Sequence, residues 1–137
     1  SVGSNDLTQY LLAVDRNNPH VANVYSHFHP AVLRALQRLV QDCIENQKPV
    51  SICGEMAGDP LTAILLMAMG FNTLSMSSSN ILRVRKAICH VPMADAKKLL
   101  NEVLQMNNPL VIKSWLEHYF RTHGLGDMVK SNRLVNA

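Results

Sequence analysis

Residues 50–60 read VSICGEMAGDP and predict a short strand, a loop and the start of a helix. The strand is expected over residues 50–53, where Val50 and Ile52 favour extended backbone because their side chains branch at Cβ. The helix is expected to begin at Asp59 and Pro60, since proline is favoured at the first helical position, and to end at Gly70.

The same order of strand, loop and helix occurs on both sides of this stretch. Residues 73–76 have strand character and precede a helix expected over residues 80–90. The stub 1–3 precedes an apolar stripe over residues 7–14, for which Asp6 is placed as the cap. Such repeated units form parallel strands with crossover helices, and these strands are too short and too few for a complete sheet. We therefore expect an α/β fold that is the carboxyl-terminal fragment of a (β/α)8 TIM barrel.

Further helices are expected over residues 30–46, 93–106 and 109–123, so the fold should be rich in helix. Residues after Gly126 have little periodicity and are expected to fray. The organisation that follows is a single partial domain over residues 1–137. Its last barrel β/α units lie in residues 1–91, and a helical carboxyl-terminal extension with its tail lies in residues 92–137.

The composition fits one folded domain. The chain has 137 residues, 47% of them hydrophobic and 17% charged, with a mean hydropathy of +0.02, so burial can offset chain entropy. The formal net charge of +3 comes from scattered residues, and no nucleic-acid partner is expected. The longest apolar run, residues 63–70, is far shorter than the roughly 20 residues of a membrane helix, so no membrane partner is expected either.

The cysteines and the amino terminus bear on the setting of the protein. Three cysteines without CxxC spacing predict neither a disulfide framework nor a zinc cage, and a reducing, cytoplasmic setting fits best. Residues 1–5, SVGSN, lack both a basic region and an initiator Met. We therefore expect neither a signal peptide nor a natural start, and interpret the amino terminus as a cut through a longer protein.

The carboxyl ends of barrel strands carry functional side chains, and here these ends are residues 4–6, 53–55 and 77–78. Asp6 is a candidate Mg²⁺ ligand, and Asn5 a candidate donor to a phosphate or carboxylate. The alternative is that Asn5 and Asp6 only cap a helix, which the spacing alone favours. Arg16 is a candidate clamp on an anion, because its planar guanidinium matches phosphate or carboxylate oxygens, while the alternative is a solvated loop arginine.

Cys53 follows a strand and precedes Gly54, so its thiol is expected at the same end of the sheet, where glycine lets the backbone approach a ligand. A thiol there can act as a nucleophile or as a general acid, and Glu55 could tune it. The alternative is a buried small hydrophobic residue, which is how we interpret Cys43 and Cys89.

His27 and His29 invite interpretation as a metal site. Histidines at i and i+2 need a third ligand, and neither His118 nor His123 is obviously near. Metal binding by this pair is therefore the less favoured hypothesis.

Five strings carry a family resemblance in order and spacing over about residues 1–90. They are GSNDLTQY (3–10), LAVDR (12–16), HPAVLR (29–34), CGEMAGDP (53–60) and LSMS (74–77). The chain resembles the phosphoenolpyruvate-utilising enzymes, and most closely enzyme I of the bacterial phosphotransferase system. The string DRNN (15–18) and the helical carboxyl-terminal extension look more like the nitrogen-type paralogue than the sugar-type enzyme.

The resemblance implies a phosphoenolpyruvate-binding (β/α)8 barrel, of which this chain is the carboxyl-terminal part. By the family's pattern Asn5 and Asp6 contact phosphoenolpyruvate (PEP), and Asp6 also binds the Mg²⁺ cofactor. The family's pattern likewise makes Arg16 a substrate contact and Cys53 the acid that protonates the enolpyruvate carbon.

The activity that the resemblance implies is a PEP-protein phosphotransferase. The phosphoryl group passes from PEP to a histidine on a separate domain and then to a histidine-containing phosphocarrier protein, releasing pyruvate. Family members dimerise through this barrel, so a homodimer is expected. Because the second metal carboxylate and other substrate arginines come from earlier strands, the isolated chain is predicted to be inactive.

Two alternatives stay open. One is a non-catalytic regulatory or dimerisation module that keeps the barrel motif. The other is a fragment of pyruvate phosphate dikinase or PEP synthase, although the EMAGDP continuation after Cys53 and Gly54 favours enzyme I.

Overall fold

The structure, a computed structural model, describes residues 1–21 and 24–129. It contains a small sheet formed by β1 (Val2–Gly3), β2 (Ser51–Cys53) and β3 (Thr73–Ser75). The strands lie in the order β1-β2-β3 and both pairings are parallel, as predicted. The order of one strand and then helices along the chain gives an α/β fold that is rich in helix.

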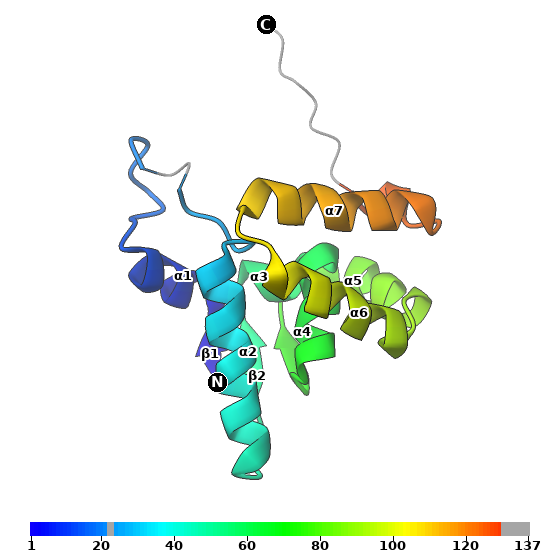
Figure 1. The fold of residues 1–137 in the computed structure, drawn as a ribbon, viewed down its shortest axis with the longest axis horizontal. Coiled ribbons are helices and arrows are strands. Elements are labelled where there is room, and N and C mark those ends of the chain that lie inside the picture. Colours follow the sequence, from blue (N-terminus) through cyan, green and yellow to red (C-terminus); the bar gives the residue numbers. More distant parts are fainter. Residues whose placement is uncertain (22–23, 130–137) are drawn as a thin grey trace, which may run out of the picture.

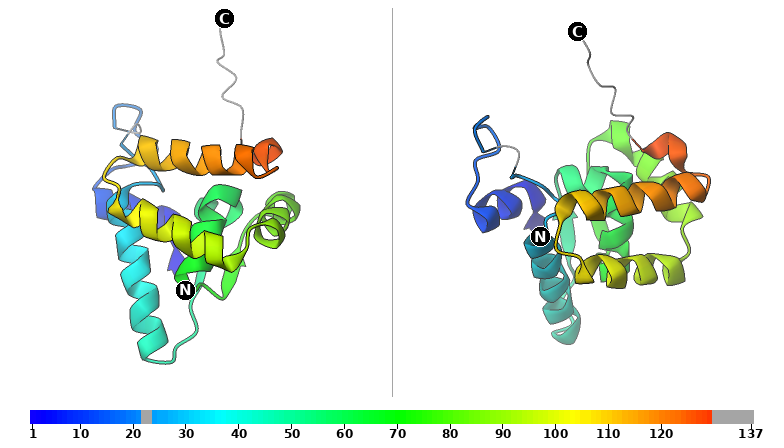
Figure 2. Two further views of the ribbon diagram at one scale, coloured as in Figure 1. Left: turned by 45° about the vertical axis from the view of Figure 1, so that its right-hand side comes forward. Right: turned by 45° about the horizontal axis from the view of Figure 1, so that its top comes forward.

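Helices pack against one side of the sheet in Figure 1, and Figure 2 shows that α7 lies alongside α6. The helices of the described residues are α1 (Ser4–Leu12), α2 (Pro30–Glu45), α3 (Glu55–Gly58), α4 (Pro60–Met69), α5 (Ser78–His90), α6 (Met93–Gln105), α7 (Pro109–Thr122) and the 3-10 turn η1 (Gly126–Met128). None of those helices combines the length and the apolar character needed to cross a membrane.

Side-chain caps explain where α4 and α7 begin. The Asp59 carboxylate accepts a hydrogen bond from the Leu61 N–H at 3.1 Å, and Pro60 occupies the first helical position of α4. Asn108 does the same for α7, with its Oδ1 accepting from the Leu110 N–H at 2.9 Å. The predicted starts of both helices are therefore confirmed.

Two sequence predictions about the chain ends are wrong. Asp6 does not cap α1, because β1 passes directly into the helix, Gly3 is the N-cap, and Asp6 lies within the first turn. The stretch after Gly126 was expected to fray, yet it forms η1 and buries Met128 and Val129. The Arg83 guanidinium holds this segment by donating to the Met128 carbonyl at 2.9 Å. The rest of the predicted tail lies outside the described residues.

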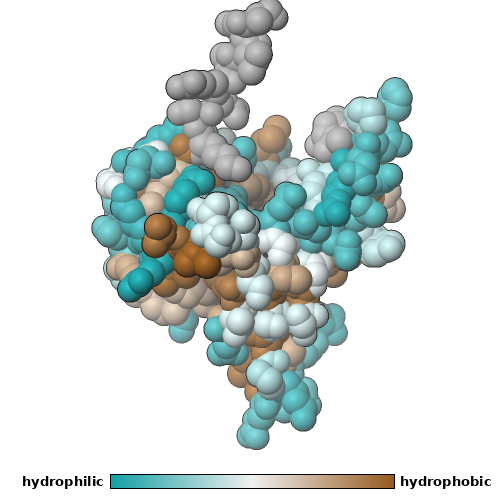
Figure 3. Space-filling model, turned by 180° about the vertical axis from the view of Figure 1, so that it is seen from behind, coloured by the Kyte–Doolittle hydropathy of each residue, from teal (hydrophilic) through white to brown (hydrophobic). Residues whose placement is uncertain are grey.

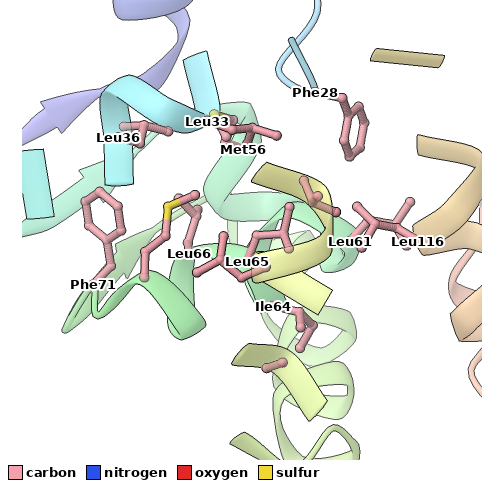
Figure 4. Close-up of a cluster of buried hydrophobic side chains, with 14 of the residues drawn as sticks. Phe28, Leu33, Leu36, Met56, Leu61, Ile64, Leu65, Leu66, Phe71 and Leu116 are labelled. Carbon is pink, nitrogen blue, oxygen red and sulfur yellow. The ribbon is translucent and has the colours of Figure 1, made fainter. Parts of the chain in front are cut away.

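Helix α4 is the centre of the core. Only Met67 and Ala68 of its residues are partly exposed, and the others are buried against α2, α5, α6 and α7. Figure 4 shows how distant segments meet around it: Phe28 from the loop before α2 and Leu116 from α7 both lie near Leu61. This core fixes β2 and the loop that follows it, because α4 begins only a few residues after the strand ends.

The two faces of the sheet differ. Val2 and Ile52, which are opposite each other in the register, are buried in the core. The alternating residues Gly3, Cys53 and Ser75 point to the other face and are exposed. One face of the sheet is therefore packed against helices, and the other is exposed and carries small or polar residues.

Candidate functional site

The three strands end level with one another. Gly3, Cys53 and Ser75 are paired in register and are the last residues of their strands. The segments that follow them surround a pocket of about 420 Å³. Its lining residues are Asn5, Cys53, Gly54, Glu55, Ser75, Met76, Ser77 and Asn80. The expectation that side chains gather at the carboxyl end of the strands is thus met for Asn5 and Cys53.

Gly54 allows the loop after β2 to lie against the start of α1. Its φ of +108° lies in a region that favours glycine. A Cβ placed on Gly54 would collide with the Ser4 hydroxyl oxygen and would lie 3.1 Å from Asn5 Oδ1. Only a residue without a side chain therefore brings Cys53 and Asn5 this close together.

The Asn5 side chain is held in one orientation. The Glu55 backbone N–H donates to Asn5 Oδ1 at 3.2 Å, and the Ser4 hydroxyl donates to the same oxygen at 3.4 Å. Because the amide oxygen already accepts two hydrogen bonds, the amide nitrogen is the group available to a ligand. Asn5 therefore presents a hydrogen-bond donor at the pocket.

The three cysteines differ in exposure and in their distance along the chain from the pocket-lining segments. Cys53 is exposed and lines the pocket. Cys43 is half-buried, and Cys89 is exposed, so the interpretation of Cys89 as a buried hydrophobic residue is wrong. Cys89 lies near the end of α5, where Val84 and Ala87 are the buried residues of the helix.

Asp6 and Arg16 lie outside the lining of this pocket. Asp6 follows Asn5 on α1 and is exposed, and among the described residues its carboxylate forms no ion pair. Arg16 is exposed in the loop after α1, where its backbone N–H donates to the Gln9 side chain at 3.4 Å. The structure thus brings Asn5 and Cys53 into one pocket, and Asp6 and Arg16 are not among the residues that line it.

Sequence reasoning missed Tyr25, which connects these residues. Its hydroxyl donates to the Asn5 carbonyl at 3.3 Å and is 3.0 Å from His27 Nε2. Burial raises the pKa of Tyr25, while a hydrogen bond from the Arg16 side chain lowers it, and the charges of Glu55 and Asp6 raise it further. A tyrosine 20 positions from Asn5 has no local sequence signal that would point to this contact.

The two histidines that suggested a metal site have other partners. Burial lowers the pKa of His27, whose ring packs edge-on against Tyr25 with centroids 5.2 Å apart. His29 caps α2 instead, with its Nδ1 accepting from the Ala31 N–H at 3.2 Å. Across residues 1–21 and 24–129, no three potential ligands among His, Cys, Asp and Glu gather to hold a metal ion.

A second cavity of about 270 Å³ lies beside the pocket, between the loop before α2 and α7. Glu55 and Asn80 line both the pocket and this second cavity. Lys113 and Glu117 of α7 line the second cavity but not the pocket. Because Lys113 and Glu117 belong to α7, part of the carboxyl-terminal extension lies next to the candidate site.

Residues 13–21, in the loop after α1, are hydrophilic and project from the body of the protein in Figure 3.

Comparison with known proteins gives the family. The family profile described as "PEP-utilising enzyme, PEP-binding domain" matches residues 1–93. A Salmonella typhimurium protein named "Phosphoenolpyruvate-dependent phosphotransferase system" is 38% identical over 130 residues, which are 95% of this chain and 17% of that protein. The phosphoenolpyruvate-protein phosphotransferase of Cupriavidus necator is 41% identical over 109 residues, 80% of this chain and 19% of that protein.

A third relative, the phosphoenolpyruvate-protein phosphotransferase of Borreliella burgdorferi, is 37% identical over 119 residues, 87% of this chain and 21% of that protein. The chain thus spans about a fifth of the length of these relatives. The resemblance read from the NDLTQY and CGEMAGDP strings is confirmed, because the match covers both strings and the whole pocket. The chain belongs to the family of phosphoenolpyruvate-utilising enzymes, and its first 93 residues match that family's PEP-binding domain.

Proposed function

We propose that this chain is the carboxyl-terminal part of the PEP-binding (β/α)8 barrel of a PEP-protein phosphotransferase, of the nitrogen-type branch. The observation that carries the proposal is the shared pocket of Asn5 and Cys53 at the level ends of parallel strands. Residues 1–91 are then the last β/α units, and residues 92–137 are the extension that packs beside them.

The open face of the sheet supports a barrel. In an independent parallel sheet helices cover both faces, yet here Gly3, Cys53 and Ser75 are exposed on one face. In a barrel that face points to the interior, where inward-facing side chains of all the strands fill the space. The edges of β1 and β3 are the places where further strands would pair, since the sheet order leaves each with one neighbour.

The chemistry of the pocket fits the proton transfer that follows phosphoryl transfer. When the P–O bond of PEP breaks, the phosphoryl group goes to the acceptor histidine and the enolate oxygen keeps the electron pair. Re-forming the carbonyl moves electrons to the terminal carbon, which takes the proton of the Cys53 thiol and gives pyruvate and a thiolate. Asn5 donates a hydrogen bond to the bound anion from its amide nitrogen, and Arg16 adds a positive charge.

Mg²⁺ fits the remaining carboxylate. This ion binds through one or two carboxylates together with water and substrate phosphate oxygens, so it needs no complete protein cage. Asp6 is exposed beside Asn5 and has no ion-pair partner among the described residues, so its oxygens are available to such an ion. Bound there, Mg²⁺ would neutralise charge on the phosphoryl group.

The partners follow from the same proposal. A histidine on another domain accepts the phosphoryl group and passes it to a phosphocarrier protein in the cytoplasm, and the complete enzyme is a homodimer. The chain alone carries one candidate metal carboxylate and one candidate substrate arginine near the pocket. We therefore expect the isolated 137-residue chain to release no pyruvate from PEP and Mg²⁺ in the presence of a carrier.

Cysteine alkylation in the complete protein tests the pocket directly. Cys53 and Cys89 are both exposed, and only Cys53 lines the pocket. PEP with Mg²⁺ is expected to slow the reaction of iodoacetamide with Cys53 by at least about tenfold, because the ligand covers the thiol, and to leave Cys89 unchanged. Peptide mass spectrometry gives both rates in one sample. Equal rates at Cys53 with and without PEP would contradict the proposal, whereas protection at both cysteines would indicate a general stabilisation.

A further inference from the structure

The third strand, like the other two, ends at the pocket. Four of the lining residues belong to β3, to the segment that leads from it into α5, or to α5 itself, and the last of them is Asn80. Because β2 is the central strand, Asn5 and Asn80 follow the strands on either side of the one that Cys53 ends. Neighbouring strands lie about 4.8 Å apart, so the ends of three strands span about 10 Å, which is enough for one small anion.

The side-chain amide of Asn80 has no hydrogen-bond partner within the described part of the chain. The residue lies in the first turn of α5, where its backbone N–H donates to the Ser77 carbonyl at 2.9 Å, and its side chain is half-buried. Burial of a polar group without a hydrogen bond costs free energy. A ligand in the pocket that accepted a hydrogen bond from this amide would remove that cost.

The absence of a side chain at Gly58 gives the Asn80 amide its place. Helix α3 packs against α5, and a Cβ placed on Gly58 would lie 2.7 Å from Asn80 Nδ2 and 3.4 Å from Asn80 Cγ. The glycines with positive φ in the described residues are Gly54, Gly70 and Gly124, so Gly58 is required for space and not for its backbone conformation. This close contact restricts the rotamers of Asn80, and a restricted side chain loses less entropy when it binds a ligand.

The wall of the pocket offers an anion few other donors. Glu55 is the one charged side chain among the described residues that line it. The Asn5 amide nitrogen faces the pocket, whereas the Ser77 hydroxyl already pairs with another serine hydroxyl at 3.1 Å. The Ser75 hydroxyl can donate one hydrogen bond, while the nitrogen of an amide can donate two. Asn80 therefore offers the pocket more unused donors than any serine of its wall.

We propose that Asn80 is a further substrate-binding residue. Its amide nitrogen donates to an oxygen of PEP from one side of Cys53, while the Asn5 amide donates from the other side. PEP carries a carboxylate and a phosphate, two groups of acceptor oxygens for which two separated amides are matched donors. This inference rests on the proposed function, in which PEP occupies the pocket.

Two substitutions of Asn80 in the complete protein test the contact. Asn80→Ala removes the donor and is expected to raise KM for PEP by about 5- to 30-fold, with kcat within about twofold. Asn80→Asp keeps a side chain of the size that packs on Gly58 but places a negative charge beside an anion. KM should therefore rise further in Asn80→Asp than in Asn80→Ala.

Asn72→Ala is the matched control. Asn72 is exposed and lies outside the lining of the pocket, so the same change of residue type there should leave KM for PEP unchanged. If Asn80→Ala impairs folding, Asn80→Asp provides the measurement, because it preserves the packing against α3.

Gly58→Ala tests whether packing positions the amide. The new Cβ meets Asn80 Nδ2, so this variant is expected to raise KM for PEP about three- to tenfold. In an Asn80→Ala background the donor is gone, and only the Cβ of that residue, at 3.5 Å, remains near the new methyl group. There Gly58→Ala should change KM by less than about twofold. The same factor in both backgrounds would show that Gly58 does not act through the Asn80 amide.

The alkylation experiment on Cys53 separates this inference from the proposed function. If PEP with Mg²⁺ does not protect Cys53 in the unsubstituted protein, the proposed function fails, and this inference with it. If Cys53 is protected but either Asn80 variant leaves KM for PEP unchanged, Asn80 is not a donor to the substrate while the proposed function stands. Protection of Cys53 together with a raised KM in both variants supports the inference.

Discussion

The backbone N–H of Glu55 donates to Oδ1 of Asn5 at 3.2 Å, although the two residues are 50 positions apart. The bond joins the loop after β2 to the first turn of α1, across the end of the sheet. It leaves the Asn5 amide nitrogen to face the pocket that Cys53 lines. The geometry of the candidate site therefore depends on how closely these two segments approach.

Gly54→Ala should separate the two segments. The new Cβ would collide with the Ser4 hydroxyl and would hold an alanine at a φ of +108°, so we expect the free energy of unfolding of the chain to fall by about 2–4 kcal/mol. Thermal and urea unfolding measure this loss. The control is Gly124→Ala, which has a φ of +76° but no atom within 4 Å of the new Cβ, and should cost only about 1 kcal/mol. Equal losses at the two glycines would contradict the importance of the contact with Ser4.

Substitutions of Asn5 should separate the two roles of its side chain. Asn5→Asp keeps an acceptor for the Glu55 N–H but replaces the donor with a negative charge. We expect the stability of this variant to stay within about 1 kcal/mol, and its affinity for the anionic substrate in the complete protein to fall by more than about tenfold. Asn5→Ala should lower both the stability of the chain and its affinity for the substrate, because it removes the acceptor and the donor. Calorimetric titration with PEP and thermal unfolding of the two variants check this, and tight binding by Asn5→Asp would exclude a donor role for the amide.

Protonation of His27 should destabilise the folded chain in acid. Burial lowers the pKa of His27 below its ordinary value of 6.5, so between 6.5 and the folded pKa the unfolded chain binds a proton that the folded chain does not. Stability contributed by the neutral ring is therefore present above pH 6.5 and is lost as the pH falls below it. Unfolding free energies measured from pH 7.5 to 5 should show a smaller slope for His27→Gln than for the unsubstituted chain. An NMR titration that places the His27 pKa at or above 6.5 would contradict this prediction.

Arg34 should stabilise the junction between α6 and α7. Its guanidinium donates to the Leu104 and Met106 carbonyls at 3.1 and 3.2 Å, and to the Asn107 side chain at 2.8 Å. Arg34→Ala should lower the free energy of unfolding by about 1–2 kcal/mol, because carbonyls at the end of α6 lose their donor. Arg38→Ala, one turn later on the exposed side of α2, should change it by less than about 0.5 kcal/mol. Similar melting temperatures for the two variants would count against a role for Arg34 in holding the junction.

Much of the fold was predictable because local signals mark its boundaries. The pairs Asp59-Pro60 and Asn108-Pro109 begin α4 and α7, and Gly70 ends α4 in a left-handed conformation, as the sequence suggested. The four-residue helix α3 was missed, since it is too short for helical periodicity to show. The cap of α1 was assigned to Asp6 because the passage from β1 into the helix at Ser4 leaves no loop that a sequence pattern could indicate.

The candidate site was predictable only in part. Cys53 ends β2 and Asn5 lies two residues after the end of β1, and parallel strands bring such positions together, so their shared pocket follows from the pattern. Tyr25 contacts Asn5 and His27, and these contacts depend on how a long loop folds back. That path is set by the packing of Phe28 in the core, and no spacing in the sequence indicates it.

Helix α4 packs densely against α6 and α7, so the segment that matches the family is shorter than the segment that forms the core. The family match stops at residue 93, but the helices beyond it cover the apolar flanks of α4. A polypeptide truncated after residue 93 would retain every pocket-lining residue and would expose Ile64 and Leu65 to water. It would be expected to aggregate during expression, so a polypeptide that carries the site needs α6 and α7 as well as the residues that the family match covers.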